Sequence, residues 1–190
     1  MVYFRIWRYA ITTACVFLLS ALGNAGPAES TVYVAGLNYQ VVMKGTGSGF
    51  CISKGYVLTA GHCANMGSTT RVRDYKGVWH NATVYAKGEP DWAILSVPTL
   101  DVPHLPIDFD GVRQNEAVGV YGRFAEGMRS NGGHVQDWMF QGAYQHATTK
   151  VYPGYSGGPV VDADGEVVGI VSQMTPGGNT LYVPVLSVGR

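Results

Sequence analysis

The sequence predicts an all-β fold, and three features of its 190 residues support that prediction. Glycine contributes 26 residues, about twice its usual share, which is typical of a chain with many turns. Short apolar or alternating runs recur between Gly, Asn and Ser residues, and no Ala/Glu/Lys/Leu-rich stretch favours a helical bundle. Short strands at this spacing indicate barrels or a sandwich rather than βαβ units.

Individual runs define the expected strands. Some are continuously apolar, as in buried strands, and others alternate between polar and apolar residues, as in half-buried strands. The predicted strands are Thr31–Val34, Tyr39–Met43, Gly49–Ser53, Tyr56–Thr59, Arg71–Tyr75, Val78–Ala86, Trp92–Val97, Ala117–Tyr121, His134–Thr148, Pro159–Val161, Glu166–Ser172 and Leu181–Val185. The proline-containing stretch Pro98–Gly111 is the expected connection between two structural units. We expect the first unit to comprise residues 31–105 and the second residues 106–190.

Composition limits the possible partners. Apolar residues make up 46% of the chain, so a substantial core can form, and charged residues make up only 14%. Thirteen basic residues balance thirteen acidic ones. This balance argues against a nucleic-acid partner and against binding to an anionic membrane surface.

The first 25 residues have the composition of a signal peptide. Arg5 and Arg8 precede an apolar run from Ala10 to Leu22, and small residues follow at Gly23 and Ala25. A run of this length is shorter than the ~20 residues that span a bilayer. We therefore expect a secreted protein, extracellular or periplasmic, with a short uncut membrane anchor as the alternative. Membrane contact is expected only if this segment is retained.

Two cysteines remain outside that segment, Cys51 and Cys63. A cysteine pair in an exported chain favours a disulfide. Two free buried thiols are the alternative, and a metal site is less favoured because a pair alone lacks the four ligands that zinc needs. We expect no metal and no other cofactor.

Three segments carry residues suited to nucleophilic catalysis: Tyr56–Cys63 with His62, Asp91–Leu95 with Asp91, and Pro153–Pro159 with Ser156. A serine hydroxyl is a weak nucleophile that needs a nearby base, and that base needs an orienting carboxylate. Glycines beside the serine let backbone N–H groups converge on one point, where an oxyanion can be stabilised.

The G-x-S-x-G pattern around Ser156 also matches the α/β-hydrolases, in which the histidine follows the serine. The histidines here are His62, His80, His104, His134 and His146, so every one precedes Ser156. The chain is also too short and too poor in helix signals for that fold.

In the order His62, Asp91, Ser156, the three segments resemble the trypsin-like (chymotrypsin-fold) serine proteases. Leu58–Cys63 is similar to the histidine motif of the family, and Gly154–Pro159 is similar to its serine motif. The stretch Gly157–Ile170 is also similar to the bacterial HtrA-type branch. The resemblance covers roughly residues 31–188.

The resemblance implies two antiparallel β-barrels with the active site in the cleft between them. It implies that His62 is the general base, that Asp91 orients it, and that Ser156 is the nucleophile. The N–H groups of Gly154 and Ser156 would form the oxyanion hole. Cys51 and Cys63 match the disulfide that flanks the histidine loop in the family, which HtrA-type members generally lack.

One departure from the family concerns activation. Tyr155 stands where animal trypsins carry the aspartate that receives the new N-terminus after zymogen cleavage, and the Ile-Val-Gly-Gly start of those enzymes is missing. We therefore expect activity without insertion of a free N-terminus.

The resemblance also locates the pocket for the residue before the scissile bond. Its walls would be Lys150, Val151 and Tyr152 on one side, and Val171, Ser172, Gln173 and Met174 on the other. A lysine at the pocket floor argues against Arg or Lys substrates, because like charges repel. An inward amine would favour acidic residues, and an outward amine would leave an apolar pocket for aliphatic residues. The second outcome is favoured, because burying an unpaired ammonium is costly.

The sequence thus predicts a serine endopeptidase that acts on a protein or peptide substrate through a His-Asp-Ser triad. A viral-type protease that processes its own polyprotein would use the same chemistry. A protease-like binding module without turnover is the alternative from a different class.

Overall fold

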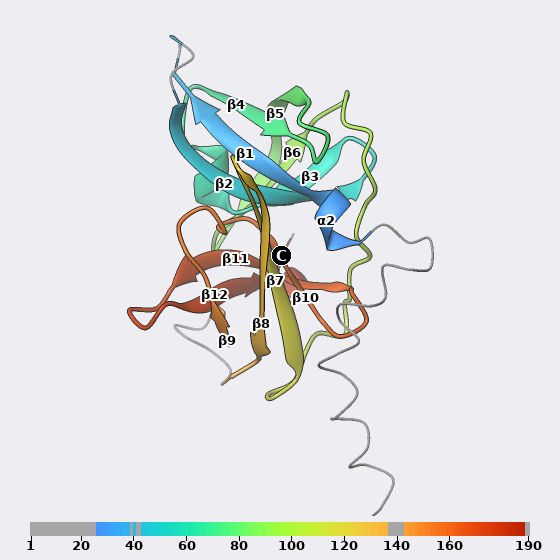
Figure 1. Cartoon of the computed structure of the whole chain (residues 1–190), viewed down its shortest axis with the longest axis vertical. Coiled ribbons are helices and arrows are strands. Elements are labelled where there is room, and N and C mark those ends of the chain that lie inside the picture. Colours follow the sequence, from blue (N-terminus) through green and yellow to red (C-terminus); the bar gives the residue numbers. More distant parts are fainter. Residues whose placement is uncertain (1–25, 39, 41–42, 137–142, 189–190) are drawn as a thin grey trace, which may run out of the picture.

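The computed structural model describes residues 26–38, 40, 43–136 and 143–188. It contains two β-sheet units (Figure 1). The first unit is a closed barrel with the strand order β1-β2-β3-β6-β5-β4. Its strands are β1 (Thr31–Leu37), β2 (Met43–Ser53), β3 (Tyr56–Thr59), β4 (Thr69–Arg73), β5 (Trp79–Gly88) and β6 (Trp92–Ser96). Neighbouring strands are antiparallel, and the interior is filled by small and branched apolar side chains such as Val34, Val57 and Leu95.

The second unit is a six-stranded antiparallel sheet with the order β8-β7-β10-β11-β12-β9. Its strands are β7 (Ala117–Phe124), β8 (Gly127–His134), β9 (Gln145–Lys150), β10 (Pro159–Val161), β11 (Val167–Met174) and β12 (Asn179–Pro184). The sheet curls until a single bridge, Val135 to Ala147, links the segment after β8 to β9. The all-β prediction is confirmed, but this unit is a curled half-barrel because one bridge replaces a full β8–β9 ladder.

Helices are few and short in the described part of the chain. They are α2 (Pro27–Ser30), α3 (Gly61–Ala64) and the 3₁₀ helix η2 (Val185–Ser187). In the ranges that the structure covers, none has the length and apolar character needed to cross a membrane.

A third apolar cluster joins the two units. Phe50 and Leu58 from the first barrel pack in one buried cluster with Tyr121 and Ile170 from the second unit and with Leu105 from the connection between them. Burying a side chain of this size stabilises a protein by about 1.5–3 kcal/mol. The shared cluster therefore fixes the position of one unit relative to the other, which a site built from both units requires.

Two predicted strands, Tyr56–Thr59 and Pro159–Val161, coincide with β3 and β10. The predicted strand His134–Thr148 is wrong as one element, because β8 ends at His134 and β9 begins at Gln145, and residues 137–142 lie outside the described part. The predicted strand Tyr39–Met43 falls mostly on residues outside the described part, and so does the predicted signal peptide, residues 1–25.

The predicted disulfide is wrong, because Cys51 and Cys63 are both free and buried. The strand position that faces Cys63 is Gly47, where an added Cβ would lie 2.5 Å from the Cys63 Sγ. Cys51 is four residues further along β2, or about 13 Å at the rise of a strand. Its thiol donates instead to the Ser53 carbonyl at 3.0 Å, and burial raises its pKa to about 11.

Candidate active site

His62 lies in α3, which is separated from the end of β3 by one residue, Ala60. Its backbone N–H donates to Asp91 Oδ1 and its Nδ1 to Asp91 Oδ2, both at 2.8 Å. The close approach requires the preceding residue to be small, because a Cβ at Gly61 would lie 3.0 Å from Asp91 Oδ1. The carboxylate thus holds both the main chain and the ring of His62, and it fixes the tautomer with the proton on Nδ1.

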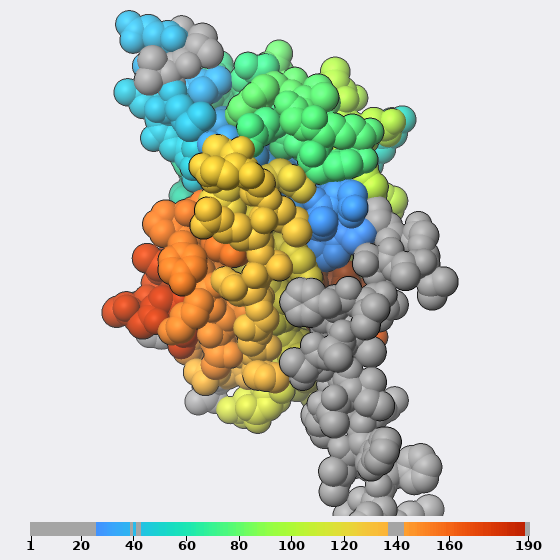
Figure 2. Space-filling view, viewed as in Figure 1, coloured from blue at the N-terminus to red at the C-terminus, as the bar shows by residue number. Residues whose placement is uncertain are grey.

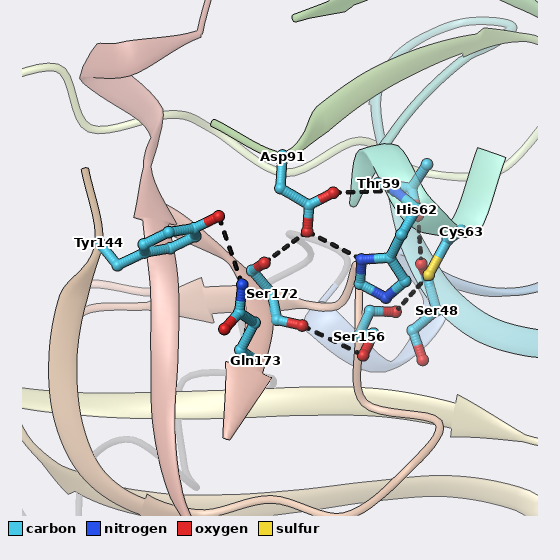
Figure 3. Close-up of polar contacts among 9 residues, drawn as sticks. All are labelled: Ser48, Thr59, His62, Cys63, Asp91, Tyr144, Ser156, Ser172 and Gln173. Atoms are coloured by element: carbon cyan, nitrogen blue, oxygen red, sulfur yellow. Dashed lines mark hydrogen bonds and ion pairs between the residues drawn. The ribbon is translucent and has the colours of Figure 1, made fainter. Parts of the chain in front are cut away.

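Asp91 lies in the turn between β5 and β6, with a side chain that is only 14% exposed. Besides the two bonds from His62, its Oδ2 accepts the hydroxyl of Ser172 from β11 of the second unit (Figure 3). Burial opposes ionisation, but the hydrogen bonds from His62 and Ser172 outweigh it and keep the pKa of Asp91 below its ordinary value. Asp91 is therefore an anion at neutral pH.

The same contact changes the basicity of the histidine. The hydrogen bond with Asp91 raises the pKa of His62 above its ordinary value, and burial offsets only part of that effect. The imidazole ring stays accessible, with 48% of the side chain exposed. A group of this kind can accept a proton and hold the resulting charge against the carboxylate.

Ser156 lies in the loop between β9 and β10, and in Figure 3 the His62 ring lies between Asp91 and Ser156. Its hydroxyl donates to the Ser172 carbonyl at 3.4 Å. Among the described residues, no hydrogen bond joins Ser156 Oγ to the ring of His62. Such bonds are often long or misaligned in unliganded enzymes and shorten when substrate binds.

The loop around Ser156 leaves two backbone donors available. Gly154 has φ +107° and Gly157 has φ +85°, conformations that side chains rarely adopt. Within the described ranges, neither the Gly154 nor the Ser156 N–H has an acceptor. Tyr155, between them, is buried against Phe124, with ring centroids 5.1 Å apart. Two free N–H groups beside a serine can stabilise an oxyanion.

The predicted pocket residues fall into two groups. Val151, Val171 and Ser172 are buried, whereas Tyr152 and Met174 are more than half exposed. The remaining two are exposed and hydrogen-bonded. Lys150 Nζ donates to the Gly177 carbonyl and to Asn179 Oδ1, and Gln173 Nε2 lies 3.4 Å from the Tyr144 hydroxyl. The lysine is thus engaged with the β11–β12 hairpin.

Two functional contacts were missed by sequence reasoning. Ser172 was expected only as a pocket wall, yet its hydroxyl binds Asp91. A β-bulge between Val171 and Gln173 interrupts the strand pairing at Ser172, and bulges commonly redirect a side chain next to a site. Ser48, whose backbone N–H donates to the Ser156 carbonyl at 2.7 Å, was not considered at all. The sequence around Ser172 predicts a strand but not the contact of its hydroxyl with Asp91, and Ser48 stands directly before a predicted strand.

No group of His, Cys, Asp and Glu side chains suited to holding a metal ion is present in the part of the chain that the structure describes.

Comparisons with known proteins identify the family and the fold. The family model for the trypsin-like peptidase domain matches residues 47–170. Among solved structures, the active form of the Rv3671c protease from M. tuberculosis has a TM-score of 0.73 at 23% identity, covering 83% of this chain and 77% of that chain. The serine endoprotease from Yersinia pestis has a TM-score of 0.73 at 24% identity, covering 83% of this chain and 59% of that chain. No curated protein matches. At these identities the structural likeness shows the fold.

The raised pKa of His62 predicts the pH dependence of activity. We expect His62 to act as the general base, which requires a neutral ring, so kcat/KM should rise with pH as His62 loses its proton. Because Asp91 stabilises the imidazolium, we expect the midpoint of this rise above pH ~6.5, the value of an unperturbed histidine. Asp91→Asn should move the midpoint to lower pH and reduce kcat by about 10³- to 10⁴-fold.

The measurement is kcat/KM for a peptide substrate across the pH range. Asp101→Asn is the matched control, because that carboxylate is 86% exposed and pairs with Lys54 at the surface. The control should follow the parent profile. A midpoint that does not move in Asp91→Asn would contradict the assignment.

Proposed function

This chain belongs to the trypsin-like peptidase family, and from that premise we propose an exported serine endopeptidase in which His62, Asp91 and Ser156 act as one catalytic unit. The family assignment makes the chain a serine endopeptidase. The catalytic roles of the three residues are proposed from the position of the His62 ring. Its Nδ1 is hydrogen-bonded to Asp91 at 2.8 Å, and the Ser156 hydroxyl lies on its other side (Figure 3).

The chemistry follows from these positions. Ser156 Oγ attacks the peptide carbonyl carbon while its proton passes to Nε2 of His62. The N–H groups of Gly154 and Ser156 stabilise the negative charge on the carbonyl oxygen. The C–N bond breaks as His62 returns the proton to the leaving amine. Water, deprotonated by His62, then hydrolyses the acyl-enzyme and restores the Ser156 hydroxyl.

Export is supported by the N-terminal sequence. Arg5 and Arg8, the apolar run at residues 10–22 and the small residues Gly23 and Ala25 match the three parts of a secretory signal. Cleavage after Ala25 would leave a chain that begins just before α2. The substrates would then be proteins or peptides outside the cytoplasm.

Substrate preference depends on where the charge of Lys150 lies. Its ammonium is exposed and bonds to the Gly177 carbonyl and to Asn179 Oδ1, at 2.8 Å for the latter. The neighbouring pocket walls Val151 and Val171 belong to the apolar core of the second unit. Because the Lys150 ammonium is exposed and already hydrogen-bonded, it does not require an acidic substrate residue as a partner. The apolar walls Val151 and Val171 therefore favour small or medium aliphatic residues before the scissile bond.

Removing the nucleophile tests the proposed function. Ser156→Ala should lower kcat by about 10⁴-fold or more, because the covalent route is lost and only binding and the oxyanion donors remain. The parent enzyme should gain one fluorophosphonate adduct on Ser156, measured by intact mass and peptide mapping. The same mass reports where the N-terminus was cut.

Ser53→Ala is the control, since Ser53 is exposed in the first barrel and its substitution should change neither turnover nor labelling. Parent protein that is folded, unlabelled and inactive would contradict the proposed triad and would favour a binding module.

A peptide-library cleavage profile tests the pocket. We expect dominant cleavage after aliphatic residues, and Lys150→Ala should change kcat/KM for the best substrate by less than about threefold, because exposed polar contacts contribute little. Lys54→Ala, another exposed lysine, provides the comparison. Dominant cleavage after Arg or Lys would show that the pocket is wrongly assigned, and dominant cleavage after Asp or Glu would place the ammonium inside it.

A further inference from the structure

Ser48 on β2 holds the loop that carries the two proposed oxyanion donors, which we define as the oxyanion loop, Gly154–Ser156. Its hydroxyl donates to the Gly154 carbonyl and its backbone N–H to the Ser156 carbonyl, both at 2.7 Å. A peptide unit is planar, so fixing a carbonyl fixes the whole unit. The peptide that carries the Ser156 N–H therefore lies between two units that Ser48 anchors.

The hydroxyl of Ser48 is itself held in place. It accepts the backbone N–H of Arg123, from β7 of the second unit, at 2.9 Å. The Ser48 carbonyl accepts the hydroxyl of Thr59 at 2.6 Å, and Ser48 has no exposed surface. Because a hydroxyl has one proton to donate, the short bond to Gly154 defines its orientation. An alanine here would leave the Gly154 carbonyl and the Arg123 N–H without this partner.

The side chain of Arg123 extends the connection to the start of the described chain. Its Nε donates to the Thr31 carbonyl and its Nη2 to the Ala28 carbonyl. Burial lowers the pKa of Arg123, so these carbonyls compensate a guanidinium that is poorly hydrated. In Figure 2 the blue surface of the N-terminal segment lies below the green part of the first barrel and beside the yellow surface of the β7–β8 hairpin. We call residues 26–31 the N-terminal strap.

We propose that Ser48 and Arg123 form a relay that couples the N-terminal strap to the oxyanion loop, with Ser48 as a positioning residue. The proposal rests on the proposed function, because it takes the N–H groups of Gly154 and Ser156 as the oxyanion donors. The strap acts through main-chain carbonyls on a guanidinium, so no free N-terminus has to be inserted. This is consistent with the buried, uncharged Tyr155 in the middle of the loop.

The test combines kinetics with amide hydrogen exchange in Ser48→Ala and Arg123→Gln. Ser48→Ala should lower kcat by about 10- to 100-fold, less than the loss of an oxyanion donor itself, with KM within about threefold. Exchange of residues 152–158 should become faster. Arg123→Gln should accelerate exchange in both residues 26–31 and 152–158, with a smaller loss of kcat, because the backbone N–H to Ser48 remains.

Thr70→Ala is the matched control. Thr70 is also a buried hydroxyl in the first barrel, and it donates to the Ala64 carbonyl at 3.3 Å. A general loss of stability would affect all three variants, whereas the relay affects kcat and loop exchange only in Ser48→Ala and Arg123→Gln. If Ser48→Ala does not fold, the Arg123→Gln variant tests the relay through hydrogen exchange at residues 26–31 and 152–158.

Unchanged exchange at residues 152–158 in both variants, with kcat within about threefold of the parent, would overturn the relay. Failure of the proposed function is distinguishable, because it would appear as absent fluorophosphonate labelling of the parent protein. Hydrogen exchange does not require turnover, so it would still test the relay if the parent protein were not labelled.

Discussion

The largely buried carboxylate of Asp91 is the group on which the rest of the site depends. It accepts the main-chain and ring N–H groups of His62 from the first barrel and the hydroxyl of Ser172 from the second unit. A buried charge without partners is costly, and one that is fully hydrogen-bonded is tolerated. The two units must therefore be aligned for the carboxylate to be satisfied, and the same alignment brings His62 beside Ser156 (Figure 3).

Several polar contacts between the units support this alignment. The backbone N–H of Ser48 reaches the Ser156 carbonyl, and Arg73 Nη2 donates to the carbonyls of Phe124 and Ala125 at 3.0 and 2.9 Å. Arg73 also lies over the ring of Tyr33, 5.0 Å from its centroid. Burial in the shared apolar cluster supplies stabilisation, and the hydrogen bonds between the units define the geometry.

Sequence reasoning recovered what local patterns encode. Continuous apolar runs gave the bounds of β3 and β10, and the three chemical segments gave the residues that the fold brings together. It missed β8, because Gly127–His134 is rich in glycine and polar residues and has no apolar face to detect. The predicted disulfide between Cys51 and Cys63 is wrong, because Gly47 and not Cys51 faces Cys63.

The contacts of Ser48 and Ser172 were out of reach for a different reason. Ser48 lies 106 residues before Gly154, and Ser172 lies 81 residues after Asp91. Each pair joins a residue of the first unit to a residue of the second. A serine in a strand carries no local sign that its hydroxyl will bridge two units, so only the three-dimensional arrangement identifies it.

The central claim is that the active site spans both units and is formed before substrate binds. A crystal structure with a bound peptide boronic acid tests it most directly. We expect a tetrahedral boronate on Ser156 Oγ, with one oxygen about 2.7–3.1 Å from the N–H nitrogens of Gly154 and Ser156. The Asp91 carboxylate should keep its hydrogen bonds to His62 and Ser172. A boronate absent from Ser156, or an oxyanion loop that must rearrange to accept it, would contradict a preformed site that spans both units.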